Sequence, residues 1–463
     1  MRAAAGAHAS RHSFAGVRRS PHQAPAPHRR GGVSLPLLVI LVPVLFGLMG
    51  FAVDLGRLYL VRGELNQAAS AMALAAAGQL IGTDASLGNA TTAAAQSLDN
   101  TNGFGNKYNF GSLTLGEPNG NLTNTVNPPA YFATVAAATG ADLTAGQADG
   151  STARHVQISV SADAPLLFWS LLTLGQSRKT SVAAVAVAGI SAPLCTACGI
   201  EFFAVAPIDP TDTVNFGFGD PTAGLTYTFA YACSGNPAPG AISGGGPVVP
   251  YVLLNRYDAA NATLDETQQL YRIGAQGLLA STNPNPTGSA VPLACVGIND
   301  PSETIWATAI PGACTIAAPV SVAEALCGLY SRLDNAGTPA ACSAVTDFAG
   351  LSAAYLPDID TLTNSTSVYT SYAGNGRRIV TVPIVSGLGA PFSGTMTVLA
   401  LRQFLVEPAA DGTFFNPFDT NGRFPVQYIG SPAPVKQGYI DDRFALGCPA
   451  PVASGPGKVV LHQ

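Results

Sequence analysis

The feature that most constrains this chain is an uncharged apolar run at residues 33–53, VSLPLLVILVPVLFGLMGFAV. A helix of these 21 residues is about 32 Å long, which matches a bilayer hydrocarbon core of roughly 30 Å. Pro36 and Pro43 would bend the helix, and membrane helices tolerate such bends better than soluble ones. The sequence therefore predicts a transmembrane helix over residues 33–53.

Charge on the two sides of this run differs sharply. Residues 1–53 contain six arginines and no acidic residue, whereas the remainder carries 16 basic and 27 acidic residues. The positive-inside rule makes residues 1–32 a basic cytoplasmic tail and places the C-terminal bulk outside the cytoplasm, in a single-pass protein of the cytoplasmic (inner) membrane. A cleaved signal peptide and a twin-arginine signal at Arg29-Arg30 are alternatives, but the length of the run and the lack of an Ala-x-Ala site favour a retained anchor.

The balance of charge also bears on partners. Nucleic-acid binders concentrate basic residues on their folded part, and here the folded part is acidic. We therefore expect no nucleic-acid partner.

Helical periodicity continues after the apolar run. Apolar residues follow at alternating spacings of three and four, which is typical of a helix-packing seam. The seam consists of Leu58, Val61, Leu65, Ala68, Met72 and Ala75. Either this amphipathic helix folds back on its own domain, or it packs against other subunits or partner helices, and the sequence leaves both interpretations open.

Histidine usage argues against catalysis and metal binding. Of six histidines only His155 lies within the expected folded body, whereas zinc sites need clustered ligands and triad hydrolases need an oriented histidine. His155 begins an alternating stretch, His155–Val160, that reads as a strand, so we expect an exposed histidine at a strand edge. The sequence predicts no catalytic, cofactor-binding or metal-binding residue.

Cysteines are confined to the C-terminal part of the chain. An even number outside the cytoplasm indicates disulfides, but eight cysteines allow 105 pairings and we assign none. The candidates are Cys195, Cys198, Cys233, Cys295, Cys314, Cys327, Cys342 and Cys448. The Cys-x-x-Cys spacing at residues 195–198 also suits a redox pair or a metal, although no βαβ pattern and no second such motif accompanies it.

Several carboxylates occur close together in sequence. Asp209, Asp212 and Asp220 form one group, and Asp358 and Asp360 form another, so either could serve in acid–base chemistry. No second signal supports that chemistry. Because aspartate is common in turns, we expect solvated turn residues at these positions.

The overall pattern predicts an α+β fold. Beyond the transmembrane helix and its amphipathic continuation, we expect a helix and mixed α/β region over residues 54–190, with strands at Val156–Val160 and Val182–Ala188. The apolar segment Leu166–Leu174 between those strands suits a core helix or a second membrane contact, but it is too short to span a bilayer. Residues 191–463 are expected to form a cysteine-containing, β-rich extracytoplasmic domain.

The segment Gly50–Leu80, GFAVDLGRLYLVRGELNQAASAMALAAAGQL, together with the preceding apolar run, resembles the N-terminal segment of TadE/TadG-like Flp (tight adherence) pilus-assembly proteins. A weaker similarity follows at Val156–Gly189. Two departures from the family pattern are Ser70, where the family often has Asp, and Leu37, where a prepilin would have Glu, and these favour an uncleaved TadG-like chain. The metal motif of some TadG-like proteins has its nearest match at Asp300–Thr304, where Pro301 suits a turn better.

The resemblance implies a membrane-anchored, non-enzymatic component of Flp pilus assembly or a cell-envelope scaffold, with a role in adhesion. Its partners would be the membrane and other pilus-assembly or envelope proteins, and no cofactor is implied. The alternative is a membrane-tethered extracytoplasmic enzyme or ligand-binding protein with its site in residues 191–463. A buried cleft with paired carboxylates would favour that alternative.

Overall fold

The computed structural model describes residues 34–97, 124–140, 146–166, 168, 179–198, 200–201, 203–232, 240–242, 246–254, 295–298, 305–307, 320–330, 332–333, 342, 358–360, 368–388, 394–408, 415–435, 437–439 and 455–462. The helices are α1 (Ser34–Ala77), α2 (Ser86–Gln96), α3 (Val135–Ala138) and α6 (Val320–Tyr330), with 3-10 turns η3 (Pro221–Ala223) and η6 (Tyr369–Ser371). The strands are β1 (Asn124–Val126), β2 (Ala130–Phe132), β3 (His155–Pro165), β4 (Lys179–Ile190), β5 (Thr196–Cys198), β6 (Phe203–Val205), β7 (Thr226–Tyr231), β8 (Val248–Leu253), β9 (Cys295–Gly297), β10 (Ile305–Ala307), β11 (Ile379–Val385), β12 (Gly394–Met396), β13 (Val398–Val406), β14 (Phe424–Gly430), β15 (Gln437–Tyr439) and β16 (Val459–His462).

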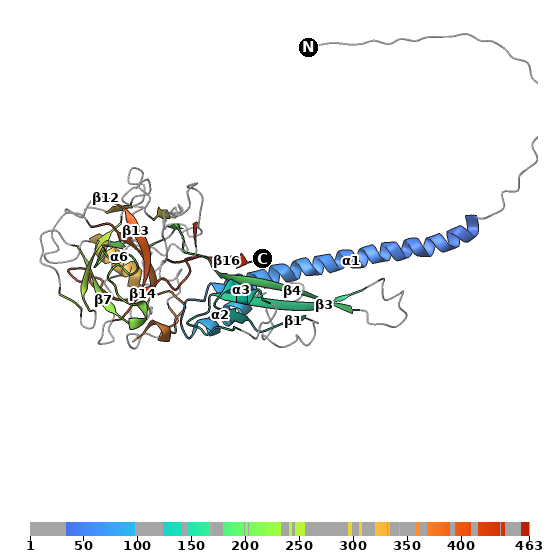
Figure 1. The fold of residues 1–463 in the computed structure, drawn as a ribbon, viewed down its shortest axis with the longest axis horizontal. Helices are drawn as coiled ribbons and strands as arrows, with labels where there is room; N and C mark the ends of the chain where they lie inside the picture. Colours follow the sequence, from blue (N-terminus) through green and yellow to red (C-terminus); the bar gives the residue numbers. More distant parts are fainter. Residues whose placement is uncertain are drawn as a thin grey trace, which may run out of the picture.

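Helix α1 is one continuous helix of 44 residues, about 66 Å long, with Pro43 inside it. Its N-terminal half projects from the rest of the described chain, and its C-terminal half lies against a sheet (Figure 1). The prediction that the helix continues beyond the apolar run is therefore confirmed, as is the α+β fold class.

The sheet beside α1 is built on a long antiparallel hairpin of β3 and β4, which pair from His155↔Gly189 to Pro165↔Lys179. Residues of β3 alternate as the sequence predicted: Val156, Ile158 and Val160 are buried, while the residues between them are only partly buried. The buried residues share one core with the C-terminal half of α1 and with alanines of β4. Small alanine side chains on both surfaces let the helix axis approach the sheet closely.

The chain returns to this sheet at its C-terminal end. Strand β16 pairs antiparallel with β4, and the sheet order is β1-β3-β4-β16, with β2 also paired to β3. Residues 459–462 therefore complete a sheet whose other strands all come from residues 124–190. The domain boundary near residue 190 stays a prediction. The structure adds that β16, from residues 459–462, pairs with a strand that precedes this boundary.

The second unit is a closed six-stranded barrel with the order β11-β13-β14-β7-β8-β6. Two of its pairings are parallel, β7 with β8 and β6 with β11. Alternate residues of each strand point inward, and Phe203, Phe229 and Phe424 contact one another edge to face with ring centroids 5.5–5.9 Å apart. The barrel interior is therefore a packed aromatic core.

Helix α6 shares the barrel core through Val322, Leu326 and Leu329, all of them fully buried. The helix is linked to Cys342 by a disulfide from Cys327, 15 residues earlier in the sequence. Two smaller sheets complete the described fold, β15-β5-β9 and β10-β12.

Candidate functional site

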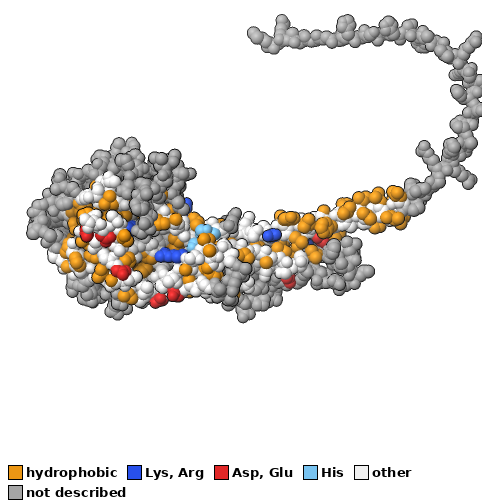
Figure 2. Space-filling view, in the orientation of Figure 1, with side chains coloured by type: hydrophobic (Ala, Val, Ile, Leu, Met, Phe, Trp, Pro, Cys, Tyr) orange, Lys and Arg blue, Asp and Glu red, His pale blue; other side chains and the backbone are white. Residues whose placement is uncertain are grey.

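The N-terminal half of α1 is an exposed apolar surface. Large apolar side chains are uncovered on all its faces, including Phe46, Met49 and Phe51, and apolar atoms cover this part of the helix in Figure 2. Among the described residues, α1 is the one helix long and apolar enough to cross a membrane. Such a surface suits the hydrocarbon core of a bilayer.

The seam predicted on the second half of α1 lies mostly inside the protein. Val61, Leu65, Ala68 and Met72 are buried in the core shared with β3, β4 and α2, and Leu58 and Ala75 are partly buried. Full burial of a side chain such as Leu65 or Met72 contributes about 1.5–3 kcal/mol. In this structure the seam faces the chain's own sheet.

The opposite face of α1 is open just beyond the apolar run. Tyr59 and Leu60 are 69% and 70% exposed. Gly56 and Gly63 share a face with Leu60 at helical spacing, and apart from neighbouring residues and the backbone of α1 itself no described atom lies within 4 Å of a Cβ built on either glycine. This open face, comprising Gly56, Tyr59, Leu60 and Gly63, is free of the rest of the described chain.

A polar junction joins the α1 unit to the barrel. The Tyr369 hydroxyl donates to the Ile81 carbonyl at 2.6 Å, and the Asp84 backbone N–H donates to the Thr370 carbonyl at 2.8 Å. Tyr369 lies in a buried cluster that also holds Ile81, and burial raises its pKa. The turn after α1 is thereby tied to the segment that precedes β11.

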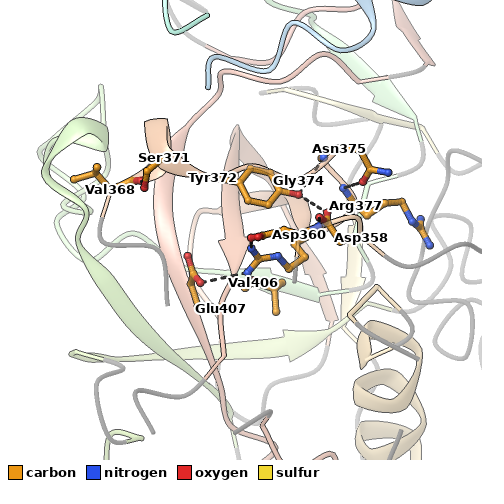
Figure 3. Close-up of polar contacts among 12 residues, drawn as sticks. Asp358, Asp360, Val368, Ser371, Tyr372, Gly374, Asn375, Arg377, Val406 and Glu407 are labelled. Atoms are coloured by element: carbon orange, nitrogen blue, oxygen red, sulfur yellow. Dashed lines mark hydrogen bonds and ion pairs between the residues drawn. The ribbon is translucent and has the colours of Figure 1, made fainter. Parts of the chain in front are cut away.

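A buried charge network lies next to this junction (Figure 3). The fully buried Arg378 guanidinium pairs with the Asp360 carboxylate and, at 3.3 Å, with that of Glu407. It also lies 4.8 Å from the Tyr372 ring centroid, and the Tyr372 hydroxyl donates to the Asp358 carboxylate. Arg378 thus opposes buried negative charge where water is excluded, and it connects the segments that carry Asp360, Tyr372 and Glu407.

The aspartates of this network correct the sequence prediction. Asp358 was expected to be a solvated turn residue, but it is only 8% exposed and accepts from Tyr372 and from the Arg378 backbone N–H. Asp360 is partly buried against Arg378. Their partners are 14 to 20 residues away along the chain, so local composition gave no sign of them.

The other predicted aspartates do occupy turns, where Asp209 and Asp220 are exposed and Asp212 is partly buried. Asp209, Asp212 and Asp220 each accept hydrogen bonds from backbone N–H groups two to five residues further on. These hydrogen bonds hold the pKa of all three carboxyls below the ordinary value, led by the Thr211 side chain for Asp209 and by backbone N–H groups for the other two. Their role is to shape turns.

A second buried ion pair, which the sequence analysis missed, joins Glu201 to Arg332. Burial raises the pKa of Glu201 to about 7, and the positive charge of Arg332 opposes the rise. The Arg332 guanidinium also donates to the carbonyls of Arg377 and Ile379. The pair thus ties the segment before β6 to the start of β11.

His155 was expected at an exposed strand edge, and that prediction is wrong. The residue is only 8% exposed, because β3 pairs with β4 on one side and with β2 on the other. Its ring lies against that of His462 from β16, with centroids 5.1 Å apart and the planes at 69°. Burial, followed by the nearby His462 and Arg154, lowers the pKa of His155 to about 4.

Only some of the cysteines lie among the described residues. Cys327 and Cys342 form a disulfide, and Cys195 is also disulfide-bonded. The backbones of Cys198 and Cys295 lie opposite each other in the β5–β9 pair. The predictions for Cys233, Cys314 and Cys448, and the Asp300–Thr304 motif, fall outside the described residues. Within the part of the chain that the structure describes, no group of three or more His, Cys, Asp or Glu is placed to hold a metal ion.

Comparison with known proteins finds a family match for one part of the chain. Residues 31–79 match the family model Tad, described as Flp pilus-assembly TadE/G-like. The matched segment contains the whole of α1, with its exposed apolar half and its buried half. This confirms the resemblance seen in the sequence. No curated protein and no solved structure matches the chain.

Proposed function

We propose that this protein is a membrane-anchored, non-enzymatic component of Flp pilus assembly that acts as an envelope scaffold. The observation that carries the proposal is the coincidence of the Tad match at residues 31–79 with α1, whose first half is suited to lipid and whose second half is part of the folded domain. The match supports a role related to Flp pilus assembly. The structure supplies a continuous helical link from an anchor to the sheet.

The proposed orientation follows from charge. The arginine-rich residues 1–32 lie in the cytoplasm, residues 33–53 span the inner membrane, and the sheet and barrel lie outside. Disulfide-bonded Cys195 and the Cys327–Cys342 disulfide suit an oxidising compartment. Protease added to spheroplasts should digest the C-terminal bulk and spare an epitope placed in the tail, and the reverse pattern would overturn the orientation.

A scaffold role is supported by how the carboxylates are used. Asp358, Asp360 and Glu407 are held by Arg378 or Tyr372, and Glu201 is held by Arg332. Acids held in this way fix the geometry of the protein. An acid–base site would instead need carboxylates that face a substrate.

Partner proteins are proposed to contact the open face of α1. The seam is occupied by the chain's own sheet, whereas Leu60, between the open Gly56 and Gly63, is an apolar surface of α1 that the described residues leave exposed. Small residues beside a large one allow two helices to approach closely.

A deletion strain tests the proposal. Loss of surface filaments and of surface attachment, both restored by the wild-type chain, is the expected result. A Leu60→Lys variant should reach normal levels in the membrane yet fail to restore filaments, whereas Ile208→Lys, at a 48% exposed barrel position, should restore them. Normal filaments in the deletion strain would overturn the pilus role.

A further inference from the structure

The β3–β4 hairpin runs along α1 toward the apolar half of the helix (Figure 1). The last pair of the hairpin is Pro165↔Lys179, at the end of the hairpin that lies toward the apolar half of α1 (Figure 1). This direction is set by the register of the hairpin and by the packing of its alanines on α1.

Phe168 lies directly on α1. A Cβ added to Gly50 would come within 2.5 Å of the Phe168 Cβ, so the glycine is the residue that makes room for the phenylalanine. The Phe168 backbone N–H donates to the Asp54 Oδ2 at 2.9 Å, one helical turn further along. Asp54 is only 5% exposed, so the hydrogen bond is sheltered from water.

The position of Gly50 sets the depth of Phe168. Gly50 lies three residues before the end of the uncharged run at Val53, which is about 4.5 Å along the helix. If residues 33–53 span the bilayer, Phe168 is therefore level with the outer boundary of the hydrocarbon core. Its side chain is 41% exposed, and the exposed Met49 and Phe51 of α1 lie at the same level.

We propose that Phe168, three residues beyond the end of β3, lies in the outward-facing interface of the bilayer that holds α1 and makes a second lipid contact. This rests on the anchoring described under the proposed function. The occupant is lipid because Phe168 is continuous with the exposed apolar surface of the anchor itself. The Asp54 carboxylate satisfies a backbone N–H at a depth where water is scarce and an unpaired N–H is costly.

Two contacts with the membrane have a mechanical consequence. A single helix lets the domain tilt around one point, whereas α1 and Phe168 in contact with lipid at the same level restrict that tilt. The sheet would then stand along the direction of α1, and the barrel would be held at a fixed distance from the membrane.

Depth-dependent fluorescence quenching tests the proposal on the full chain in phosphatidylcholine vesicles. The two native tryptophans, Trp169 and Trp306, are replaced by phenylalanine, and one tryptophan is introduced as Phe168→Trp. Bromine is placed on the lipid either near the glycerol end or near the middle of the acyl chains. We expect the Phe168→Trp emission to fall strongly with the shallow bromine and less with the deep one.

Two matched probes make the result decisive. Phe46→Trp, at a 66% exposed position inside the span, should be quenched most by the deep bromine, and Phe418→Trp, at a 37% exposed barrel position, should not be quenched. If Phe168→Trp behaves like Phe418→Trp while Phe46→Trp is quenched, the Phe168 contact is overturned and the anchor stands. If Phe46→Trp is not quenched, the anchor itself fails.

A second pair of variants tests the hydrogen bond. Asp54→Ala removes the acceptor for the Phe168 N–H and should reduce the shallow quenching of Phe168→Trp, whereas Asp54→Asn keeps a side-chain oxygen and should retain it. Equal quenching of the tryptophan at position 168 in both variants would show that the hydrogen bond to Asp54 does not position this residue.

Discussion

The Tyr369 hydroxyl donates a hydrogen bond of 2.6 Å to the backbone carbonyl of Ile81, joining residues 288 positions apart. Ile81 follows α1, and Tyr369 precedes β11 of the barrel. The contact between the α1 unit and the barrel therefore depends on buried groups that can be changed one at a time.

Tyr369→Phe removes the hydroxyl and leaves the Ile81 carbonyl without this buried donor. We expect a loss of about 1–2 kcal/mol in the free energy of unfolding, measured by denaturant titration of the full chain in detergent. Tyr59→Phe is the control, because Tyr59 is 69% exposed on α1 and should cost less than about 0.5 kcal/mol. Equal stability of the two variants would show that the junction hydrogen bond contributes nothing.

Arg378→Met replaces the central cation of the buried network by an apolar side chain and leaves Asp360 and Glu407 without their partner. Breaking a buried pair from one side is expected to cost about 3–5 kcal/mol, seen as a lower denaturant midpoint or as loss of folded protein. Arg423→Met breaks the more exposed pair with Asp419 and should cost at most about 1 kcal/mol. If Arg378→Met unfolds no more readily than Arg423→Met, the network is not a stabilising element.

His155 makes the stability of the chain depend on pH. Its pKa falls from an ordinary 6.5 to about 4 on folding, so the unfolded chain binds more protons between those values. Its stabilising contribution is therefore full above about pH 6.5 and declines toward pH 4.

Glu201 has its pKa raised to about 7 and acts in the opposite direction, losing its contribution as the pH rises through 7. The measurement is therefore the free energy of unfolding of wild type minus that of His155→Gln, followed between about pH 7 and pH 4. This difference should narrow or change sign as the pH falls. Parallel pH profiles of the two proteins would contradict the lowered pKa of His155.

Replacing either of two glycines by alanine should change the stability of the chain in opposite directions. A Cβ on Gly189 would lie 2.0 Å from the Nδ1 atom of the buried His155 ring, so Gly189→Ala must displace that ring. We expect it to destabilise the chain by about 1–3 kcal/mol. Gly88 lies inside α2 with nothing within 4 Å of its added Cβ, so Gly88→Ala should stabilise the chain by up to about 1 kcal/mol. Thermal midpoints that shift in the same direction would refute the contrast.

Elements with strong local patterns could be predicted from the sequence. The long uncharged run and the seam after it indicated α1, and the alternation at residues 156–160 and 182–188 indicated the β3–β4 hairpin. Both signals are local, because helix periodicity and strand alternation depend on neighbours a few residues away.

The sequence did not predict which strands pair with one another when they are far apart along the chain. The barrel closes through parallel pairs of β7 with β8 and of β6 with β11, and β16 joins a sheet formed more than 250 residues earlier. His155 was misjudged because neither β2 nor β16 could be placed beside it. Asp358 was misjudged because its burial depends on Tyr372 and Arg378, whose positions follow from the barrel fold.

The most direct test of the central claim compares anchored and unanchored forms of the protein in the deletion strain. One complementing copy is the full chain, and the other is residues 54–463 exported behind a cleavable signal peptide, with extracytoplasmic levels matched by immunoblot. If the protein acts as an anchored scaffold, surface filaments return with the full chain and not with the exported form. Filaments restored equally by both forms would contradict the account, since the proposed membrane anchor at residues 33–53 would then be dispensable.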